Sequence, residues 1–483
     1  MPWRDKRGRC RNRKSEEGGR TVKLFGTDGI RDLAGKGNLT PENILRIARA
    51  TAEVLKSSPA LFSRLNRTHK RKHPKVLLSL DTRSSGHMIR GSLLAGFLAS
   101  GIDIIYAGVT PAPTCSFLTR HFGCDCGVFV SASHNPNEYN GIKFFDRDGF
   151  KITEKLEQCI EEWFYSSRTP EEGEIGSYKY REDALEIYIN AAVEWALKRF
   201  DLRGKRIVAD CANGAVSYVV PELFNRLGAQ VYLLNSNPDG RNINRGGGAL
   251  LPTKTAKEVL RVAADVGFSF DGDGDRVIAV DEKGNICNGD SFISFYARFL
   301  KEQKKLKGNA VVTTVMANYG LERSLKEVDI EMVRTKVGDR YVLEEMLKRN
   351  LILGGEQSGH IILLDRTRTG DGIWTALSIL EVMHKTNRPL SALNSTIKHY
   401  PQILINIPVE QKIPFEELAG FSEHLKEAEA KLKGEGRIVL RYSGTEPLAR
   451  VMVEGKSKRL VKAVAEETAN SLKCALKRFQ RRN

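Results

Sequence analysis

Ser133 and His134 lie in a turn that could present a reactive hydroxyl group. Residues 128–145 read VFVSASHNPNEYNGIKFF, and the apolar run at the start has the Val/Phe content of a buried strand. Asn-Pro and Asn-Gly are turn signals, so we expect the serine and the histidine on a loop between two strands. A serine hydroxyl is a weak nucleophile unless a neighbouring group activates it, and here an imidazole is adjacent and the amine of Lys143 follows the turn. An ordinary turn at a strand end is the alternative interpretation.

Three aspartates at alternate positions, Asp271, Asp273 and Asp275, follow a predicted strand at residues 266–270. Glycines separate them in DGDGDR, so the carboxylates can turn toward one point, an arrangement that suits Mg²⁺. An EF-hand loop is a poorer interpretation, because Arg276 occupies the position that requires glycine and the flanking segments resemble strands. A purely structural acidic turn is the other alternative, but three clustered negative charges are costly without a cation.

Two later segments contain groups that bind polar ligands. Lys336 lies in RTKVG, and residues 354–360 read GGEQSGH. Glu356 and Ser358 can hydrogen-bond the hydroxyl groups of a ligand, and His360 can exchange protons near neutral pH. By itself, a glycine-rich turn with a histidine is more often a plain turn.

An anion cradle is predicted at residues 441–447, which read RYSGTEP. Arg441 can bind a phosphate with two parallel hydrogen bonds, and the hydroxyl groups of Ser443 and Thr445 can add to them. Gly444 leaves the backbone amide accessible to the same anion. The alternative is a surface turn.

These four loops, in this order, resemble the active-site loops of the α-D-phosphohexomutases. SASHNP with NGIK is similar to the serine loop of that family, DGDGDR to its metal loop, GGEQSGH to its sugar loop and RYSGTEP to its phosphate loop. The resemblance runs from about residue 23 to the end of the chain. It implies an isomerase that moves a phosphate between C1 and C6 of a sugar, with Mg²⁺ as cofactor and a sugar 1,6-bisphosphate as activator.

The resemblance also implies roles for individual residues. Ser133 is expected to carry the phosphate as phosphoserine and to complete the metal site with Asp271, Asp273 and Asp275. Proton transfer or orientation is expected from a group whose members we do not rank: Lys143, His134, Arg31 and His360. Substrate contacts are expected from Arg276, Lys336, Glu356, Ser358, Arg441, Ser443, Gly444 and Thr445.

Three motifs favour the amino-sugar branch of the family: Gln357 in the sugar loop, the start FGTDGIR, and VRTKVGDRYV. That branch interconverts glucosamine 6-phosphate and glucosamine 1-phosphate, on the way to UDP-N-acetylglucosamine and bacterial peptidoglycan. The segment 137–140 is closer to loops of the branch that acts on mannose and glucose phosphates, and Asp32 and Ala449 also depart from the amino-sugar pattern. A hexose phosphate mutase is therefore the alternative, and a non-catalytic, polyanion-binding relative is a third hypothesis.

The elements that must position these loops follow a repeated order. Strands expected at 75–81, 206–210 and 309–314 each end in a polar turn, and helical periodicity follows each. This indicates three similar mixed α/β units, and the remainder indicates a small α+β unit. We expect a helix at 41–56, with Thr40 as N-cap, and a long charged helix at 415–433. The resemblance implies four domains around a central cleft, at 21–175, 176–285, 286–397 and 398–483, after a basic, disordered extension at 1–20.

The charge distribution, hydropathy and cysteine content limit the kinds of partner and the cellular location that we expect. The net charge of +17 is concentrated at the periphery, because residues 1–20 hold eight Lys/Arg against three acids, residues 61–80 hold six against none, and residues 477–482 hold four. The rest of the chain is nearly neutral, so no nucleic-acid partner is expected. The sequence has neither an apolar run long enough for a membrane span nor a secretory signal. Eight scattered cysteines without a C-x-x-C pair predict reduced thiols in a cytoplasmic protein. Either a monomer or a homodimer is expected.

Overall fold

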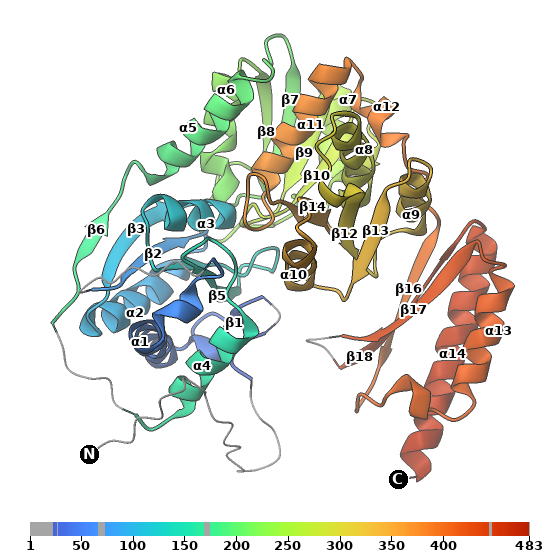
Figure 1. Cartoon of the computed structure of the whole chain (residues 1–483), viewed down its shortest axis with the longest axis horizontal. Helices are drawn as coiled ribbons and strands as arrows, with labels where there is room; N and C mark the ends of the chain where they lie inside the picture. Colours follow the sequence, from blue (N-terminus) through green and yellow to red (C-terminus); the bar gives the residue numbers. More distant parts are fainter. Residues whose placement is uncertain (1–22, 27, 66–72, 169–173, 444–446, 483) are drawn as a thin grey trace.

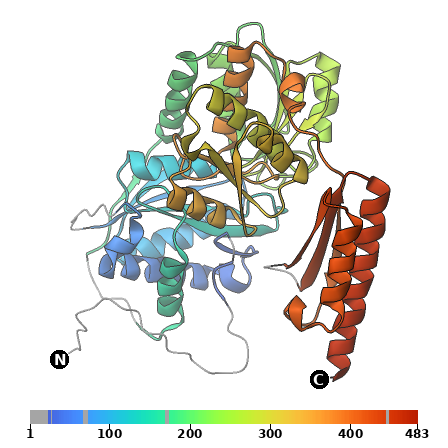
Figure 2. The ribbon, with the colours of Figure 1, turned by 45° about the vertical axis from the view of Figure 1, so that its right-hand side comes forward.

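The computed structural model describes residues 23–26, 28–65, 73–168, 174–443 and 447–482 as four units in chain order (Figure 1). Each unit is built on its own sheet. The first three have helices on both faces of the sheet, and the fourth carries its helices on one face (Figure 2). The predicted extension at 1–20 lies outside the described residues. Within those ranges, no helix has the length and apolar character needed to cross a membrane.

The first unit holds a six-stranded sheet in the order β1-β5-β4-β2-β3-β6. Its strands are β1 (Ile30–Leu33), β2 (Lys75–Leu80), β3 (Asp103–Val109), β4 (Cys126–Val130), β5 (Tyr139–Asp146) and β6 (Tyr178–Tyr180). β2, β3, β4 and β6 are parallel, whereas β5 runs antiparallel to β4 and β1 antiparallel to β5. The serine loop therefore connects two adjacent antiparallel strands in the middle of the sheet.

Helices cover both faces of this sheet. They are α1 (Pro41–Ser57), α2 (Gly86–Ala99) and α4 (Glu154–Tyr165) on one face, and α3 (Ala112–His121) on the other, with 3₁₀ turns η1 (Gly37–Leu39) and η2 (Pro59–Phe62). The predicted cap of α1 is confirmed, since the Thr40 side chain accepts a hydrogen bond from the Asn43 N–H. Phe62 is fully buried in the same core, so the start of the basic segment at residues 61–80 packs onto the unit.

The second unit has the sheet order β11-β10-β9-β7-β8. Its elements are β7 (Arg206–Asp210), β8 (Gln230–Leu234), β9 (Val266–Phe270), β10 (Val277–Asp281), β11 (Ile286–Cys287), α5 (Ala184–Leu197), η3 (Ala215–Tyr218), α6 (Val220–Arg226) and α7 (Thr253–Val262). β7 is parallel to β8 and β9, and β10 is antiparallel to both of its neighbours. The metal loop is consequently the connection between β9 and β10, in a strand–turn–strand setting that excludes an EF-hand.

The third unit has the sheet order β13-β12-β14-β15. Its elements are α8 (Gly289–Glu302), η4 (Lys307–Asn309), β12 (Ala310–Thr314), α9 (Tyr319–Lys326), β13 (Glu331–Thr335), α10 (Asp339–Arg349), β14 (Leu353–Gly355), β15 (Ile361–Leu363), α11 (Gly372–Thr386) and α12 (Leu390–Asn394). One continuous hydrophobic core joins the second and third units, with α5 and α6 contributing from one side and α8 and α11 from the other. Burial of this shared core fixes the metal loop relative to the sugar loop.

The fourth unit is a three-stranded antiparallel sheet in the order β16-β18-β17. Its elements are β16 (Gln402–Pro408), η5 (Phe415–Glu417), α13 (Phe421–Lys431), β17 (Gly436–Tyr442), β18 (Leu448–Gly455) and α14 (Lys458–Arg482). The single helix predicted at 415–433 is wrong in its first turns. Leu418 is buried in an extended conformation and Gly420 has a φ of 74°, so the helix begins only at Phe421.

Candidate active site

The serine loop holds Ser133 in a left-handed conformation, with a φ of 52°. Such a backbone costs a non-glycine residue about 1–3 kcal/mol unless its surroundings enforce it. Here the Ser133 N–H donates to Ser131 Oγ at 2.8 Å, and the Asn244 side-chain amide donates to the Ser133 carbonyl at 2.8 Å. The side chain of Ser133 is buried, and its hydroxyl points toward the metal loop.

Arg83 is the main support of this loop. Its guanidinium group is fully buried and donates to the carbonyl oxygens of Ser133, Asn135 and Pro136 at 2.9, 2.9 and 2.7 Å. Asp81 accepts from Arg83 Nε at 2.9 Å and compensates the charge. A buried cation therefore joins three carbonyl groups of one turn, in addition to the hydrogen bonds that they accept from Asn244 and from the Tyr139 N–H.

The metal loop is fixed by backbone hydrogen bonds from three helical segments. The first N–H groups of α3, η3 and α11 donate to the carbonyls of Asp273, Gly272 and Gly274. Gly274 has a φ of 73°, and a Cβ there would lie 2.6 Å from Val216 Cγ1, so glycine is required at this turn. The free N–H groups of helix starts thus orient the loop carbonyls.

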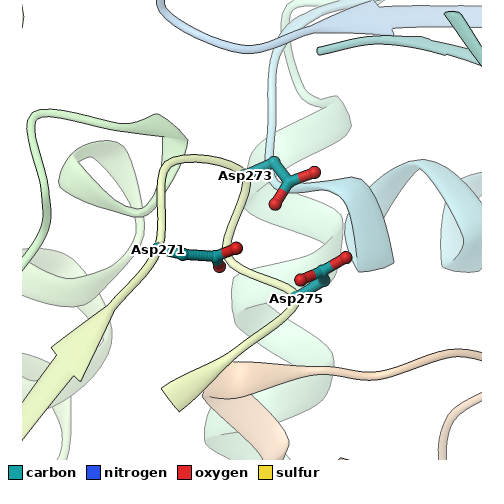
Figure 3. Close-up of side chains that lie close together, drawn as sticks. All are labelled: Asp271, Asp273 and Asp275. Atoms are coloured by element: carbon teal, nitrogen blue, oxygen red, sulfur yellow. The ribbon is translucent and has the colours of Figure 1, made fainter. Parts of the chain in front are cut away.

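Asp271, Asp273 and Asp275 point toward one another from this loop (Figure 3). All three are buried, and each offers an oxygen within 4.8 Å of the others. Asp273 Oδ1 has no hydrogen-bond partner among the described residues. Burial, with repulsion from Asp275 and Asp273, raises the pKa of Asp271 well above its usual range. A buried carboxylate oxygen without a partner in a cluster of like charges fits a hard divalent cation.

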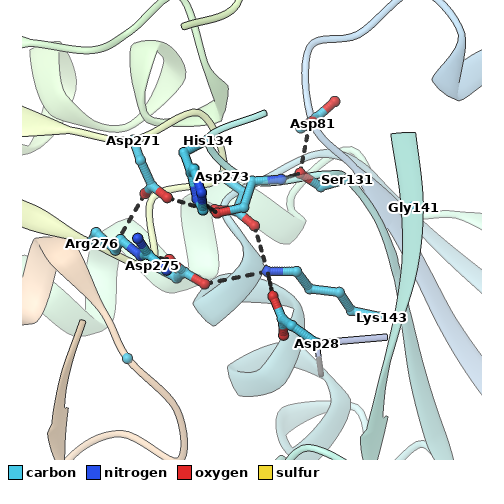
Figure 4. A network of polar contacts seen from close by, with 12 residues as sticks. Asp28, Asp81, Ser131, His134, Gly141, Lys143, Asp271, Asp273, Asp275 and Arg276 are labelled. Carbon is cyan, nitrogen blue, oxygen red and sulfur yellow. Dashed lines mark hydrogen bonds and ion pairs between the residues drawn. The ribbon is translucent and has the colours of Figure 1, made fainter. Parts of the chain in front are cut away.

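Ser133 contacts this cluster directly, because its Oγ donates to Asp271 Oδ2 at 2.8 Å. Figure 4 shows His134 and Lys143 beside the same aspartates. His134 Nδ1 lies 3.4 Å from the same hydroxyl. Burial, with repulsion from Arg276 and Arg31, lowers the pKa of His134 to about 4, so the imidazole is neutral at pH 7. The Ser133 hydroxyl thus lies between a carboxylate of the candidate metal site, Asp271, and the neutral imidazole of His134.

Lys143 lies on the other side of the cluster. Its buried amine donates to Asp273 at 2.8 Å and to Asp275 at 3.3 Å, and pairs with Asp28 at 3.1 Å. Burial alone would lower the pKa of Lys143, but Asp273, Asp28 and Asp275 raise it well above its usual range. The amine is therefore a fixed positive charge in this arrangement.

His360 joins the same network from the sugar loop. Its Nδ1 lies 3.5 Å from Asp275 and its Nε2 lies 3.4 Å from Asp339 at the start of α10. Burial opposes protonation, but the attraction of Asp275 and Asp339 prevails and raises the pKa of His360. Lys151 completes the network by binding both Asp339 and Asp28, so negative and positive groups alternate in one chain of contacts that links the first and third units.

Arg31 and Arg276 flank the cluster. Arg31 on β1 binds Asp28. The guanidinium group of Arg276 lies 3.7 Å from Asp275, and attraction to Asp275 and Asp271 outweighs burial and raises the pKa of Arg276. Both arginines are placed to meet an anion at the metal loop.

The sugar loop is held in a compact turn. Glu356 accepts from the Gly338 N–H at 3.2 Å and from Ser358 Oγ at 3.4 Å. Lys336 lies with Gly338 on the connection between β13 and α10, and it is exposed. Attraction to Glu356 raises the pKa of both Arg276 and Arg441, although burial dominates the pKa of Arg441 and lowers it. Glu356 therefore lies close enough to the metal loop and to the phosphate loop to attract an arginine of each.

The phosphate loop lies at the end of β17 in the fourth unit. Ser443 is buried, its carbonyl accepts from Lys412 Nζ at 2.6 Å, and its hydroxyl accepts from Arg450 at 3.4 Å. Repulsion from Arg450 contributes to the lowered pKa of Arg441, so the two guanidinium groups lie close together. Gly444 and Thr445 lie outside the described residues. Positive groups from β17, β18 and Lys412 thus converge on one loop, as an anion site requires.

Comparison with known proteins identifies the fold and the family. Models of the phosphoglucomutase/phosphomannomutase alpha/beta/alpha domains I, II and III match residues 22–170, 186–284 and 288–400, and the model of the C-terminal domain matches 404–471. The chain belongs to the phosphoglucomutase/phosphomannomutase family. The predicted fold of three α/β domains and a C-terminal domain is thereby confirmed, as is the prediction of an isomerase.

Curated relatives within the family are named phosphoglucosamine mutase. The protein from Alkaliphilus oremlandii is 44% identical over 92% of this chain and 98% of its own length. The one from Bdellovibrio bacteriovorus is 45% identical over 93% of this chain and 98% of its own length.

Solved structures of the family share the fold at low identity. A phosphoglucomutase/phosphomannomutase family protein from Burkholderia thailandensis has a TM-score of 0.77 at 24% identity, covering 94% of this chain and 98% of its own. The N-acetylphosphoglucosamine mutase of Aspergillus fumigatus, solved in complex with GlcNAc-6P and magnesium, has a TM-score of 0.63 at 17% identity, covering 89% and 97%.

Sequence reasoning missed several residues of this family site. Arg83 and Asn244 support the serine loop, Asp28, Lys151 and Asp339 extend the charge network, and Lys412 and Arg450 contact Ser443 of the phosphate loop. Asp28 and Arg83 lie in polar turns that the sequence shows clearly, after Phe25 and after β2. Their partners are remote in sequence, so a turn motif alone gave no role to them.

Proposed function

We propose that the protein is a phosphoglucosamine mutase, which interconverts glucosamine 6-phosphate and glucosamine 1-phosphate and supplies the synthesis of UDP-N-acetylglucosamine and peptidoglycan. The observation that carries this proposal is the contact of Ser133 Oγ with Asp271 in the buried aspartate cluster. A hydroxyl in this position can receive and return a phosphate group. The substrate follows from the names of the relatives that are 44–45% identical.

Mg²⁺ is the proposed cofactor, held by Asp271, Asp273, Asp275 and Ser133. It would neutralise negative charge on the transferring phosphate. The magnesium complex of the Aspergillus fumigatus mutase supports this choice of ion.

The residues of this chain then have distinct tasks. Phospho-Ser133 donates its phosphate to a sugar hydroxyl, and the bisphosphorylated sugar turns around and returns its other phosphate to Ser133. Arg31, Arg276 and Lys143 stabilise the negative charge of the transferring group. Arg441, Ser443, Gly444 and Thr445 hold the distant phosphate, and Lys336, Glu356 and Ser358 hold the sugar between them, so that remote binding positions the reacting end.

Proton transfer can be divided between two histidines. His134, with its low pKa and its 3.4 Å approach to Ser133 Oγ, is suited to accept a proton. His360, with its raised pKa, is suited to donate one. The high pKa of Lys143 makes that amine an electrostatic group.

The remaining proposals concern the whole chain. We place the domains at 21–175, 176–285, 286–397 and 398–483, with β6 and β11 as strands that complete the sheet of the preceding domain. A sugar 1,6-bisphosphate activates the enzyme by phosphorylating Ser133. The cysteines in the described ranges are all free thiols, and all but Cys474 are buried, which supports a cytoplasmic location.

A phosphorus NMR assay tests the function. The purified protein is incubated with Mg²⁺, a trace of glucose 1,6-bisphosphate and glucosamine 6-phosphate, while mannose 6-phosphate and glucose 6-phosphate run in parallel. We expect the anomeric phosphate signal to grow fastest with the amino sugar and to be absent in Ser133→Ala. Faster conversion of a plain hexose would instead establish the phosphomannomutase/phosphoglucomutase alternative. No conversion of any sugar by folded protein phosphorylated on Ser133 would refute the enzyme.

A further inference from the structure

A large groove lies among α3, α5, α8 and α11, apart from the residues of the active site. It has a volume of about 810 Å³. Phe117 and Arg120 line it from α3, and Trp374 and Glu381 from α11. Both helices begin at the metal loop, where their first N–H groups bind the carbonyls of Asp273 and Gly274. None of the residues that line the groove belongs to the four active-site loops, so it is a separate site.

The floor of the groove is aromatic and aliphatic. Trp195 and Trp374 meet edge to face, with ring centroids 5.2 Å apart, and Leu300 and Ile352 are buried beside them. The guanidinium groups of Arg199 and Arg366 lie 4.4 and 4.5 Å from the Trp195 ring centroid. A floor of this kind buries the apolar or planar part of a ligand.

The rim of the groove carries excess positive charge. Its two acids are already paired: Glu381 with Lys385, Arg199 and Arg366, and Asp365 with Arg366. Four further cations have no ion-pair partner in the described part of the chain: Arg120, Lys304, Lys305 and Lys307. Like charges gathered at one opening repel one another, and an anion that binds among them relieves the repulsion.

We propose that this groove binds a nucleoside di- or triphosphate. The phosphate chain meets the rim cations, since Lys and Arg bind phosphate oxygens through charge-assisted hydrogen bonds. The nucleoside lies against the floor, where the base stacks on the guanidinium groups that cover the Trp195 ring. The volume is within the range of about 300–1,000 Å³ that small-molecule sites occupy, and a groove of that size suits a nucleotide better than a polymer.

Isothermal titration calorimetry of the full-length protein tests the chemical class. ATP, adenosine and tripolyphosphate are titrated separately at constant ionic strength with EDTA present. We expect one ATP site, with adenosine and tripolyphosphate each at least about tenfold weaker, because each lacks one half of the contacts. Equal affinity for ATP and tripolyphosphate would show that the aromatic floor takes no part and would overturn the proposal.

Variants locate the site. The triple change Lys304→Gln, Lys305→Gln and Lys307→Gln should weaken ATP binding by about tenfold or more. A matched triple change of exposed lysines in the fourth unit, Lys426→Gln, Lys433→Gln and Lys473→Gln, should leave the affinity unchanged. Arg441→Ala should also leave it unchanged. Equal weakening by both triple changes, or loss of binding only in Arg441→Ala, would refute the groove as the site.

Discussion

At the scale of single residues, the position of the Ser133 hydroxyl depends on side chains outside its own loop. Ser133 adopts a strained left-handed conformation, and it does so because Arg83 and Asn244 bind the carbonyl groups of its turn. In this conformation, Ser133 Oγ donates a hydrogen bond to Asp271. Part of the folding free energy thus holds a strained backbone conformation that the proposed phosphate transfer requires.

Replacing Arg83 with methionine should therefore damage both stability and activity. The change leaves Asp81 and three loop carbonyls buried without their cation, at a cost of about 3–5 kcal/mol. The midpoint of urea unfolding should fall accordingly, together with kcat in the mutase assay. Arg203→Met is the matched control, because Arg203 forms an exposed pair with Asp201. A similar small effect in both variants would contradict the role of Arg83.

Metal binding should stabilise the folded protein. Three buried carboxylates repel one another, so a cation that binds only the folded state adds about 2.7 kcal/mol at a free concentration of about 100 times Kd. We expect Mg²⁺ to raise the Tm of EDTA-treated protein, and Asp273→Asn to abolish most of this rise. Asp239→Asn, on an exposed turn, should retain it. A Tm of wild type that does not respond to Mg²⁺ would argue against the aspartate site.

At the scale of elements, helix starts do much of the positioning. The first N–H groups of α3 and α11 orient the metal loop. In the first turn of α8, Asp290 accepts from the Asn318 N–H, beside the connection to the fourth unit. A helix N-terminus ordinarily favours a carboxylate. Asp290 is an exception, because full burial raises its pKa to about 7 despite the hydrogen bond from the Asn318 N–H.

The raised pKa of Asp290 predicts that this residue lowers the free energy of unfolding as the pH rises. Between about pH 4 and pH 7 the folded state keeps a proton on Asp290 that the unfolded chain releases, so this group lowers stability as the pH rises. Asp290→Asn keeps an acceptor for the Asn318 N–H and removes the ionisation. The Tm of the variant relative to wild type should therefore be higher at pH 8 than at pH 5. A difference that is the same at both pH values, as expected for the exposed Asp239→Asn, would contradict this assignment.

At the scale of the whole molecule, contacts between units assemble the site. Figures 1 and 2 show the fourth unit standing beside the third, and Asn318 joins them through two hydrogen bonds with the backbone of Tyr400. The first and third units are joined by Lys151, which binds Asp28 and Asp339. Burial lowers the pKa of Lys151, but both carboxylates outweigh it and raise the pKa.

Lys151→Met should therefore destabilise the junction between the first and third units. It removes the cation that the partly exposed Asp28 and Asp339 share, and the loss of these charged hydrogen bonds costs about 1.5–3 kcal/mol. We expect a lower Tm and a higher KM for the sugar phosphate, because Asp339 no longer fixes His360 relative to the first unit. Lys205→Met, which removes an exposed pair with Asp265, should cost less than about 1 kcal/mol. If the two variants have equal Tm and KM values, Lys151 does not join the units.

The sequence determined the four loops, the strands that carry them and the family, because each loop is a short motif whose residue types and spacing are local. Ser133 and the three aspartates could be predicted for that reason. The sequence did not determine the partners of those residues. Arg83 meets Ser133, Lys151 meets Asp339 and Arg437 meets Ala317 only after the sheets have formed and the shared core has packed. Long-range contacts depend on which faces are buried together, and no local pattern encodes them. The same reason explains why α13 begins only after Gly420, since Leu418 is buried in an extended conformation within a segment whose composition favoured a helix.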